Sequence, residues 1–131
     1  MKQENYYNTR NIQDLDKIGE LLNELPPFCA DYFLGIEQKT SCNYTRQCVC
    51  YRHTHLRIFF TFLVERRFRN KDVLDLTLDD LSQVVAQDIE YFLSYLSHYR
   101  FNGKRLSCDD RAKARKLSSV RSMFKYFFNK G

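Results

Sequence analysis

Apolar residues recur at intervals of three and four along most of the chain, which is the spacing of one face of an α-helix. The pattern predicts helices over 11–24, from 26 to about 38, from about 41 to 68 and from about 86 to 98. A short helical turn is expected at 77–81, and a last helix is expected after 107–110. The apolar stripe predicted for the last helix is Ala114, Leu117, Val120, Phe124, Phe127 and Phe128.

The long helix expected from about 41 to 68 is amphipathic, with one apolar face and a solvent-facing side that is basic. Its predicted core positions are Leu56, Phe59, Phe60 and Leu63 together with Cys48, Tyr51 and His55. Its predicted exposed positions are Arg46, Arg52, His53 and Arg57. Cations at 66–71 close this helix with the charge sign that the helix dipole prefers at its C-terminal end.

Capping and turn residues mark the ends of these elements. Pro26 and Pro27 cannot continue the first helix and suit the opening of the second. Thr77 and Asp80 have capping-box spacing, with Asp where Glu or Gln is usual, and Ser107-x-x-Asp110 repeats it before the last helix. Asn102-Gly103 favours a tight turn, so residues 99–106 are predicted to be a connecting loop or a small hairpin.

The composition narrows the fold class. Among 131 residues there are only 4 Gly and 2 Pro, too few for the many turns of a β-sandwich or barrel. The expected fold is therefore all-α, a compact bundle of four to five helices with one core. No apolar run is long enough for a membrane span or a signal peptide, and the chain is expected to be soluble and cytoplasmic.

The net charge of +5 hides alternating blocks of opposite sign. Residues 1–37 carry −4, residues 38–72 carry +6, residues 73–98 carry −5 and residues 99–131 carry +8. If the two basic blocks meet in space, they form one strongly positive face, and a polyanion such as nucleic acid is the first partner to consider.

Neither a metal site nor catalysis is predicted. The five cysteines are odd in number and contain no CxxC pair, so reduced thiols are expected. A zinc site from Cys48, Cys50, His53 and His55 lacks the usual spacing, because Cys48 and Cys50 point about 200° apart on one helix. The chain contains no Gly-rich phosphate loop, HExxH or GxSxG motif, and no cofactor is expected.

Four segments, taken in order, resemble the core-binding domain of tyrosine recombinases, which is the phage-integrase SAM-like domain. They are LPPFCADYFLGIEQKTS (25–41), LRIFFTFLVE (56–65), LTLDDLSQVVAQDIEYFLSYLSHYR (76–100) and RLSCDDRAKARKLSSVRSMFKYFFNKG (105–131). The resemblance implies a helical bundle that clamps duplex DNA with its long helix and its last helix. It also implies DNA integration and recombination by a separate catalytic domain, so no tyrosine of this chain is assigned as nucleophile.

The same resemblance divides the chain and suggests its partners. Residues 1–24 would be an N-terminal helical extension, and 25–131 would be the core-binding domain. The implied partners are double-stranded DNA and other recombinase protomers in a synaptic complex, without a membrane or a small-molecule substrate.

The candidate DNA contacts lie on the two basic helices. On the last helix they are Lys113, Arg115, Lys116 and Arg121, with Ser119 as a hydrogen-bonding neighbour. At the start of the long helix they are Lys39, Ser41, Asn43, Thr45 and Arg46. Lys113 and Arg115 differ by about 200° around a helix, so the set cannot all face DNA at once.

The family pattern departs from this chain at the start of the long helix. Ser41 and Leu56 are 15 positions apart, whereas the family usually places about 11 between the corresponding residues. Ser41 and Thr45 are therefore rival caps. A rival function is a helical protein-interaction module, in which exposed Tyr and Phe side chains dock a partner and the basic blocks only interact with solvent.

Overall fold

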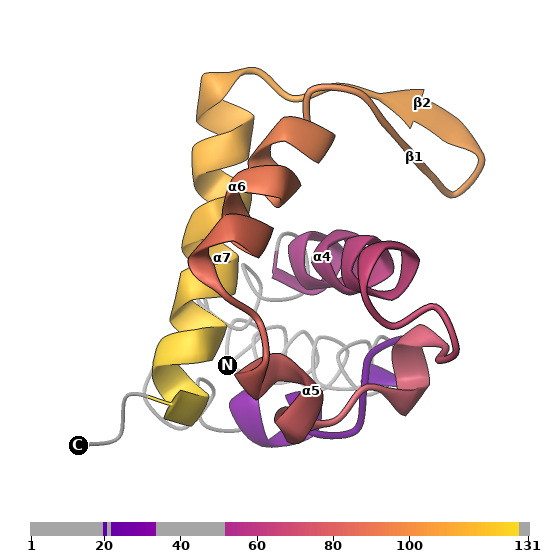
Figure 1. Ribbon diagram of the computed structural model, residues 1–131, viewed down its shortest axis with the longest axis vertical. Helices are drawn as coiled ribbons and strands as arrows, with labels where there is room; N and C mark the ends of the chain where they lie inside the picture. Colours follow the sequence, from indigo (N-terminus) through magenta and orange to yellow (C-terminus); the bar gives the residue numbers. More distant parts are fainter. Residues whose placement is uncertain (1–19, 21, 34–51, 129–131) are drawn as a thin grey trace, which may run out of the picture.

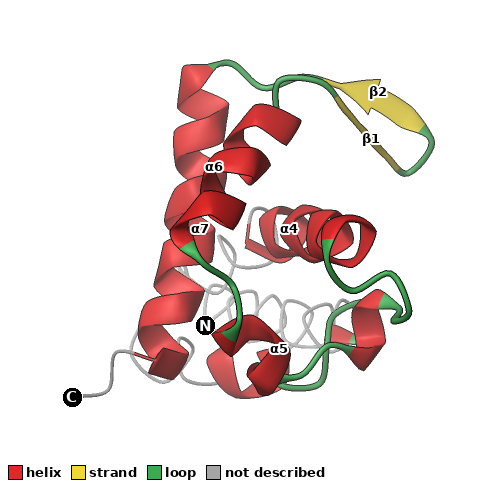
Figure 2. Ribbon diagram, viewed as in Figure 1, coloured by secondary structure: helices red, strands yellow, loops and turns green. Residues whose placement is uncertain are grey.

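The computed structural model describes residues 20, 22–33 and 52–128, and within these ranges the chain is mostly helical (Figures 1 and 2). In chain order its elements are α4 (His53–Arg66), the 3-10 helix η2 (Val73–Asp75), α5 (Leu78–Ser82), α6 (Ala86–Tyr95), β1 (Tyr99–Phe101), β2 (Lys104–Leu106) and α7 (Asp110–Phe128). The all-α class is therefore confirmed. Within the described ranges no helix is both long and apolar enough to cross a bilayer.

Helix α4 lies at the centre of the fold and packs against both α6 and α7 (Figure 1). Its predicted core residues Leu56, Phe59, Phe60 and Leu63 are all fully buried. The Phe59 ring meets Phe92 of α6 edge-to-face, with 5.0 Å between ring centroids. Such aromatic pairs add about 0.5–1.5 kcal/mol each beyond the apolar area they bury.

Helix α4 is buried over a wider arc than its predicted stripe. Phe62 is buried because its ring lies 5.3 Å from Phe92 and 5.1 Å from Tyr95, both on α6. The prediction that His53 is exposed was wrong, since its ring is buried and Nε2 lies 3.0 Å from the Glu24 carboxylate. Because α4 is contacted from several sides, little of its surface faces solvent.

Residues 25–33 form a second layer of the core. Leu25, Cys29, Tyr32 and Phe33 are buried, and residues 29–33 are helical, as expected after Pro26 and Pro27. Of the first predicted helix, residues 20 and 22 are helical and a turn follows at 23–24. The remainder of that helix, and the end of the second one, lie outside the described residues.

The predicted capping box at α5 is present. The Asp80 N–H donates to Thr77 Oγ1 at 3.2 Å, and the Thr77 N–H donates to Asp80 Oδ2 at 3.0 Å. Helix α6 begins at Ala86, as predicted, but ends at Tyr95 instead of 98. The chain turns away there because the Cys108 N–H donates to the Leu96 carbonyl at 2.8 Å and Tyr99 enters a strand.

Of the two alternatives for residues 99–106, the structure forms the hairpin. Strands β1 and β2 are antiparallel, with Tyr99 opposite Leu106, Arg100 opposite Arg105 and Phe101 opposite Lys104. Asn102 and Gly103 have φ values of 52° and 77°, as expected for a two-residue turn of type I′.

Two predictions for the last helix were wrong. Asp109, not Ser107, caps α7, because its Oδ1 accepts the Ala112 N–H at 2.8 Å. The buried face is also rotated from the predicted stripe: Met123 is fully buried, whereas Ala114 and Phe128 are exposed. At 100° per residue, Ala114 and Phe128 lie about 180° and 140° around the helix from Met123, so both are turned away from the side that packs on the core.

Candidate nucleic-acid interface

Helix α7 carries an exposed basic stripe on the side away from the core. Its exposed positions over residues 111–125 are Arg111, Ala114, Arg115, Ser118, Arg121 and Lys125. Their spacing of three and four places them on one helical face. From Arg111 to Lys125 the stripe is about 21 Å long at 1.5 Å per residue, and it contains no carboxylate.

The four cations of this basic stripe have no partner among the described residues. No ion pair or hydrogen bond found there engages the side chains of Arg111, Arg115, Arg121 or Lys125. None of the four is therefore held in an ion pair by the part of the chain that the structure describes, and the nearest carboxylates along this surface are Asp110 beside Arg111 and Glu90 across the groove from Arg121 and Lys125.

The cations that follow α4 are arranged differently. Arg67 donates to Asp88 at 2.7 Å and to the Gln83 carbonyl at 2.6 Å, and Arg66 donates to Asp88 at 3.3 Å. Lys71 donates to Asp80 at 2.6 Å. These side chains tie the end of α4 to the starts of α5 and α6, so they are structural.

The carboxyl groups of Asp80 and Asp88 in these pairs have lowered pKa values, which favour the ionised form. A hydrogen bond from Lys71 lowers the pKa of Asp80 below its ordinary value. Burial raises the pKa of Asp88, but hydrogen bonds from the Val85 N–H, Arg66 and Arg67 outweigh that effect and leave its pKa lowered.

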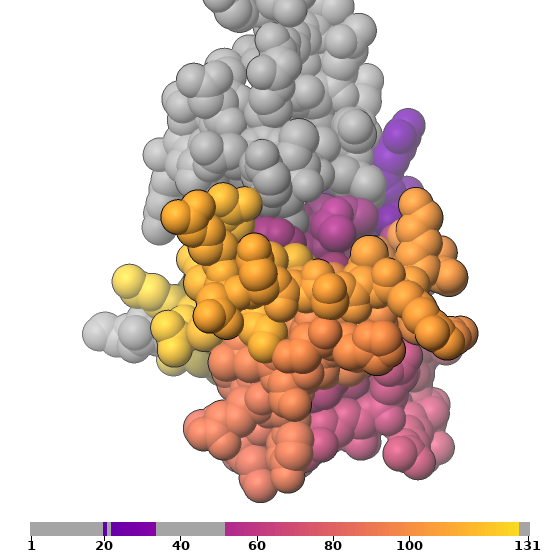
Figure 3. Space-filling view, turned by 90° about the horizontal axis from the view of Figure 1, so that it is seen from above, coloured from indigo at the N-terminus to yellow at the C-terminus, as the bar shows by residue number. Residues whose placement is uncertain are grey.

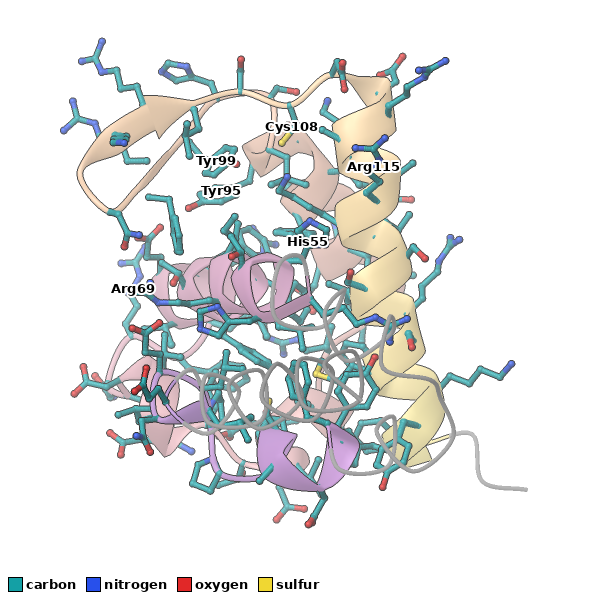
Figure 4. The ribbon with its side chains drawn as sticks, turned by 180° about the vertical axis from the view of Figure 1, so that it is seen from behind. His55, Arg69, Tyr95, Tyr99, Cys108 and Arg115 are labelled. Carbon is teal, nitrogen blue, oxygen red and sulfur yellow. The ribbon has the colours of Figure 1, made fainter. Side chains whose placement is uncertain are left out.

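The two basic blocks meet where the start of α4 packs against α7 (Figure 4). Arg52 donates to the Tyr32 hydroxyl at 2.7 Å and to the Ser122 hydroxyl at 3.1 Å. His55 Nδ1 lies 2.8 Å from Ser119 Oγ. This contact is a polar seam between α4 and α7. Arg52 is used there for hydrogen bonds inside the fold.

The electrostatics of the seam fix the charge of His55. Burial, followed by the positive charges of Lys116, Arg115 and Arg52, lowers the His55 pKa to about 4. The imidazole is therefore neutral near pH 7, and it adds no charge to this surface.

The predicted site residues of the last helix separate into two groups. Arg115 and Arg121 are exposed on the basic stripe. Lys113 is half-buried and donates to the Ser97 hydroxyl at 2.6 Å, and Lys116 is half-buried on the side of α4. Ser119 is buried against His55, so it does not share the face of Arg115 and Arg121.

The other predicted contacts, Lys39, Ser41, Asn43, Thr45 and Arg46, lie outside the described residues. The structure adds Arg111, Ser118 and Lys125 to the exposed face. The spacing 111-115-118-125 already places these residues on one face of a helix. The sequence alone does not show that this face is the exposed one, because that depends on where α4 packs.

A second surface feature lies between α6 and α7. It is a groove of about 710 Å³ that is lined mainly by apolar side chains, together with Arg121, Lys125 and Glu90. Its apolar lining includes Val85, which is 55% exposed, and Phe128, which is 46% exposed.

No cluster of three or more His, Cys, Asp or Glu side chains able to hold a metal ion occurs among the described residues. Cys29 and Cys108 are free thiols, and burial raises the pKa of Cys29. Cys42, Cys48 and Cys50 lie outside the described residues.

The chain matches no protein-family model, no curated protein and no solved structure. Its function is therefore inferred from its own residues.

Proposed function

We propose that this domain binds double-stranded DNA through the basic stripe of α7. It would act as the DNA-clamping, core-binding part of a tyrosine recombinase or integrase, with strand exchange carried out by a separate catalytic domain. The expected partners are duplex DNA and further protomers of the same recombinase.

The observation that carries the proposal is the contrast between the two sets of cations. Arg66, Arg67 and Lys71 are satisfied by Asp88 and Asp80 within the chain. The exposed cations of α7 have no such partner among the described residues and share a single face. Phosphates along a duplex supply the counter-charges in a matching linear array.

Binding would follow from ordinary physical chemistry. Each phosphate neutralised by Lys or Arg releases condensed counterions, which favours association at low salt. An α-helix fits the major groove, and the exposed Ser118 hydroxyl can hydrogen-bond a phosphate or a base edge between flanking cations. Phosphate contacts alone give affinity and register without sequence preference.

Single charge reversals on and off the stripe test the proposal. Arg115→Glu and Arg121→Glu each replace an exposed arginine of the stripe, and Arg69→Glu replaces an exposed arginine beyond the end of α4. Arg69 lies on the side of the molecule away from α7 (Figure 4), where its Nε donates to the Glu65 carbonyl at 3.1 Å. All three variants change the net charge equally.

Duplex affinity at 0.1 M salt should fall at least eightfold for Arg115→Glu and Arg121→Glu, since each loses about one phosphate contact. Arg69→Glu should bind within twofold of the unaltered protein. Equal losses in all three variants would show that only net charge matters, and unchanged affinity in the first two would refute the role of the stripe.

The groove between α6 and α7 favours a second candidate, a helical protein-interaction module. Its lining of apolar side chains with charged residues of both signs suits an amphipathic helix from a partner. Phe128→Ser separates the two functions, because it alters the groove without removing a charge. Duplex affinity should stay unchanged under the DNA-binding proposal, and complete absence of duplex binding at low salt would favour the interaction module.

A further inference from the structure

The hairpin β1–β2 has one face fixed to the body of the molecule. Tyr99 is buried and its ring lies 5.4 Å from that of Tyr95. Phe101 lies beneath the Arg57 guanidinium, 5.0 Å from carbon to ring centroid. Because side chains alternate along a strand, Arg100 projects from the opposite face.

That opposite face carries two like charges side by side. Arg100 pairs directly with Arg105 across the two strands, and both side chains are exposed. Directly opposed like charges destabilise a hairpin, whereas an Arg–Glu pair would stabilise it. Neither arginine has an ion-pair partner among the described residues.

The hairpin lies at the same end of the molecule as the first turn of α7. Figure 3 looks down on this end and shows the hairpin and the start of α7 forming one continuous surface. The stripe cation nearest this end is Arg111, in the first turn of α7. A duplex bound at Arg111 and running across this end of the molecule would reach the hairpin.

We propose that Arg100 and Arg105 together bind one backbone phosphate of duplex DNA beside the groove that α7 enters. Two guanidinium groups on neighbouring strands supply several hydrogen-bond donors to a single phosphate. The negative charge of the phosphate offsets the repulsion between the two arginines. The hairpin then sets the position of α7 along the duplex. This inference rests on the proposed DNA-binding function and adds a second contact to it.

Two variants test the pair while monitoring the fold. Arg105→Glu places a carboxylate directly opposite Arg100 across the strands, so its Tm should rise while its duplex affinity falls by at least eightfold at 0.1 M salt. Arg100→Gln/Arg105→Gln removes both charges. Its Tm should equal or exceed that of the unaltered protein, and its slope of log affinity against log salt should be less steep by about 0.9.

Arg69→Gln is the control for removing an exposed arginine elsewhere, and it should leave the slope unchanged. A double variant that binds with the unaltered slope, while Arg115→Glu is weakened, would overturn the hairpin inference and leave the DNA-binding proposal standing. A fall in the Tm of the double variant would make the pair structural and would also overturn it. No duplex binding by the unaltered protein, even at low salt, would overturn both.

Discussion

Asp88 links the start of α6 to the end of α4. Its carboxylate accepts the Val85 N–H at 2.9 Å at the start of α6 and also pairs with Arg66 and Arg67. Asp88→Asn would leave both arginines without a counter-charge and weaken the helix cap. Both arginines are about one-third exposed, which reduces the electrostatic loss.

We therefore expect Asp88→Asn to lower the free energy of unfolding by about 2 kcal/mol in urea titrations. Asp79→Asn is the matched control, because Asp79 is an exposed carboxylate in the first turn of α5. It should change stability by less than about 0.5 kcal/mol. Similar losses in the two variants would show that the Asp88 network contributes little.

The same carboxyl groups predict how stability depends on pH. The folded-state pKa values of Asp80 and Asp88 are lowered below the ordinary 3.8, so each group stabilises the fold fully above that value. This contribution is lost as pH falls through the folded-state pKa. Urea midpoints measured from pH 7 to pH 2 should therefore drop below about pH 4. In Asp88→Asn the drop should be smaller, and an identical drop would contradict the assignment.

The neighbouring serines of α7 provide a matched pair. Ser119 is buried against His55, whereas Ser118 is exposed on the basic stripe. Ser119→Ala should lower the free energy of unfolding by about 1 kcal/mol because it removes a buried hydrogen bond, with no change in the salt dependence of duplex binding. Ser118→Ala should leave unfolding unchanged. A change in salt slope for Ser119→Ala would place that hydroxyl in the interface.

Among the elements, the hairpin turn allows the cleanest test of local conformation. Gly103 has a φ of 77°, and an added Cβ would meet no atom within 4 Å. Gly103→Ala should therefore cost about 1 kcal/mol from backbone strain alone, measured by thermal unfolding. Gly103→Asn should cost less, because Asn tolerates this region better than Ala. Equal effects would indicate that the turn is not of the assigned type.

Sequence patterns predicted elements well wherever a local interaction decides the structure. Thr77 and Asp80 sit three residues apart and cap one another, and Asn102-Gly103 forms its turn without help from distant residues. The Ser107 prediction failed because Asp109 competes for the same helix start, and spacing alone does not rank two neighbouring caps.

Across the whole molecule, long-range pairing decided which charges are exposed. The alternation of acidic and basic blocks is visible in the sequence. The pairing of Arg67 with Asp88, 21 positions away, is not. Similarly, the sequence placed both Lys113 and Arg115 on a basic helix. Only the contact between α4 and α7 shows that Arg115 is exposed while Lys113 turns toward Ser97.

Binding of duplex DNA by α7 and the hairpin through phosphate contacts can be measured on the unaltered protein. The measurement is its affinity for a duplex of about 20 base pairs, by fluorescence anisotropy between about 50 and 300 mM salt. Four contacts from the α7 stripe and one from the hairpin predict a slope of about −4.5 for log affinity against log salt. Absence of binding at the lowest salt concentration, or a slope near zero, would contradict this mode of binding.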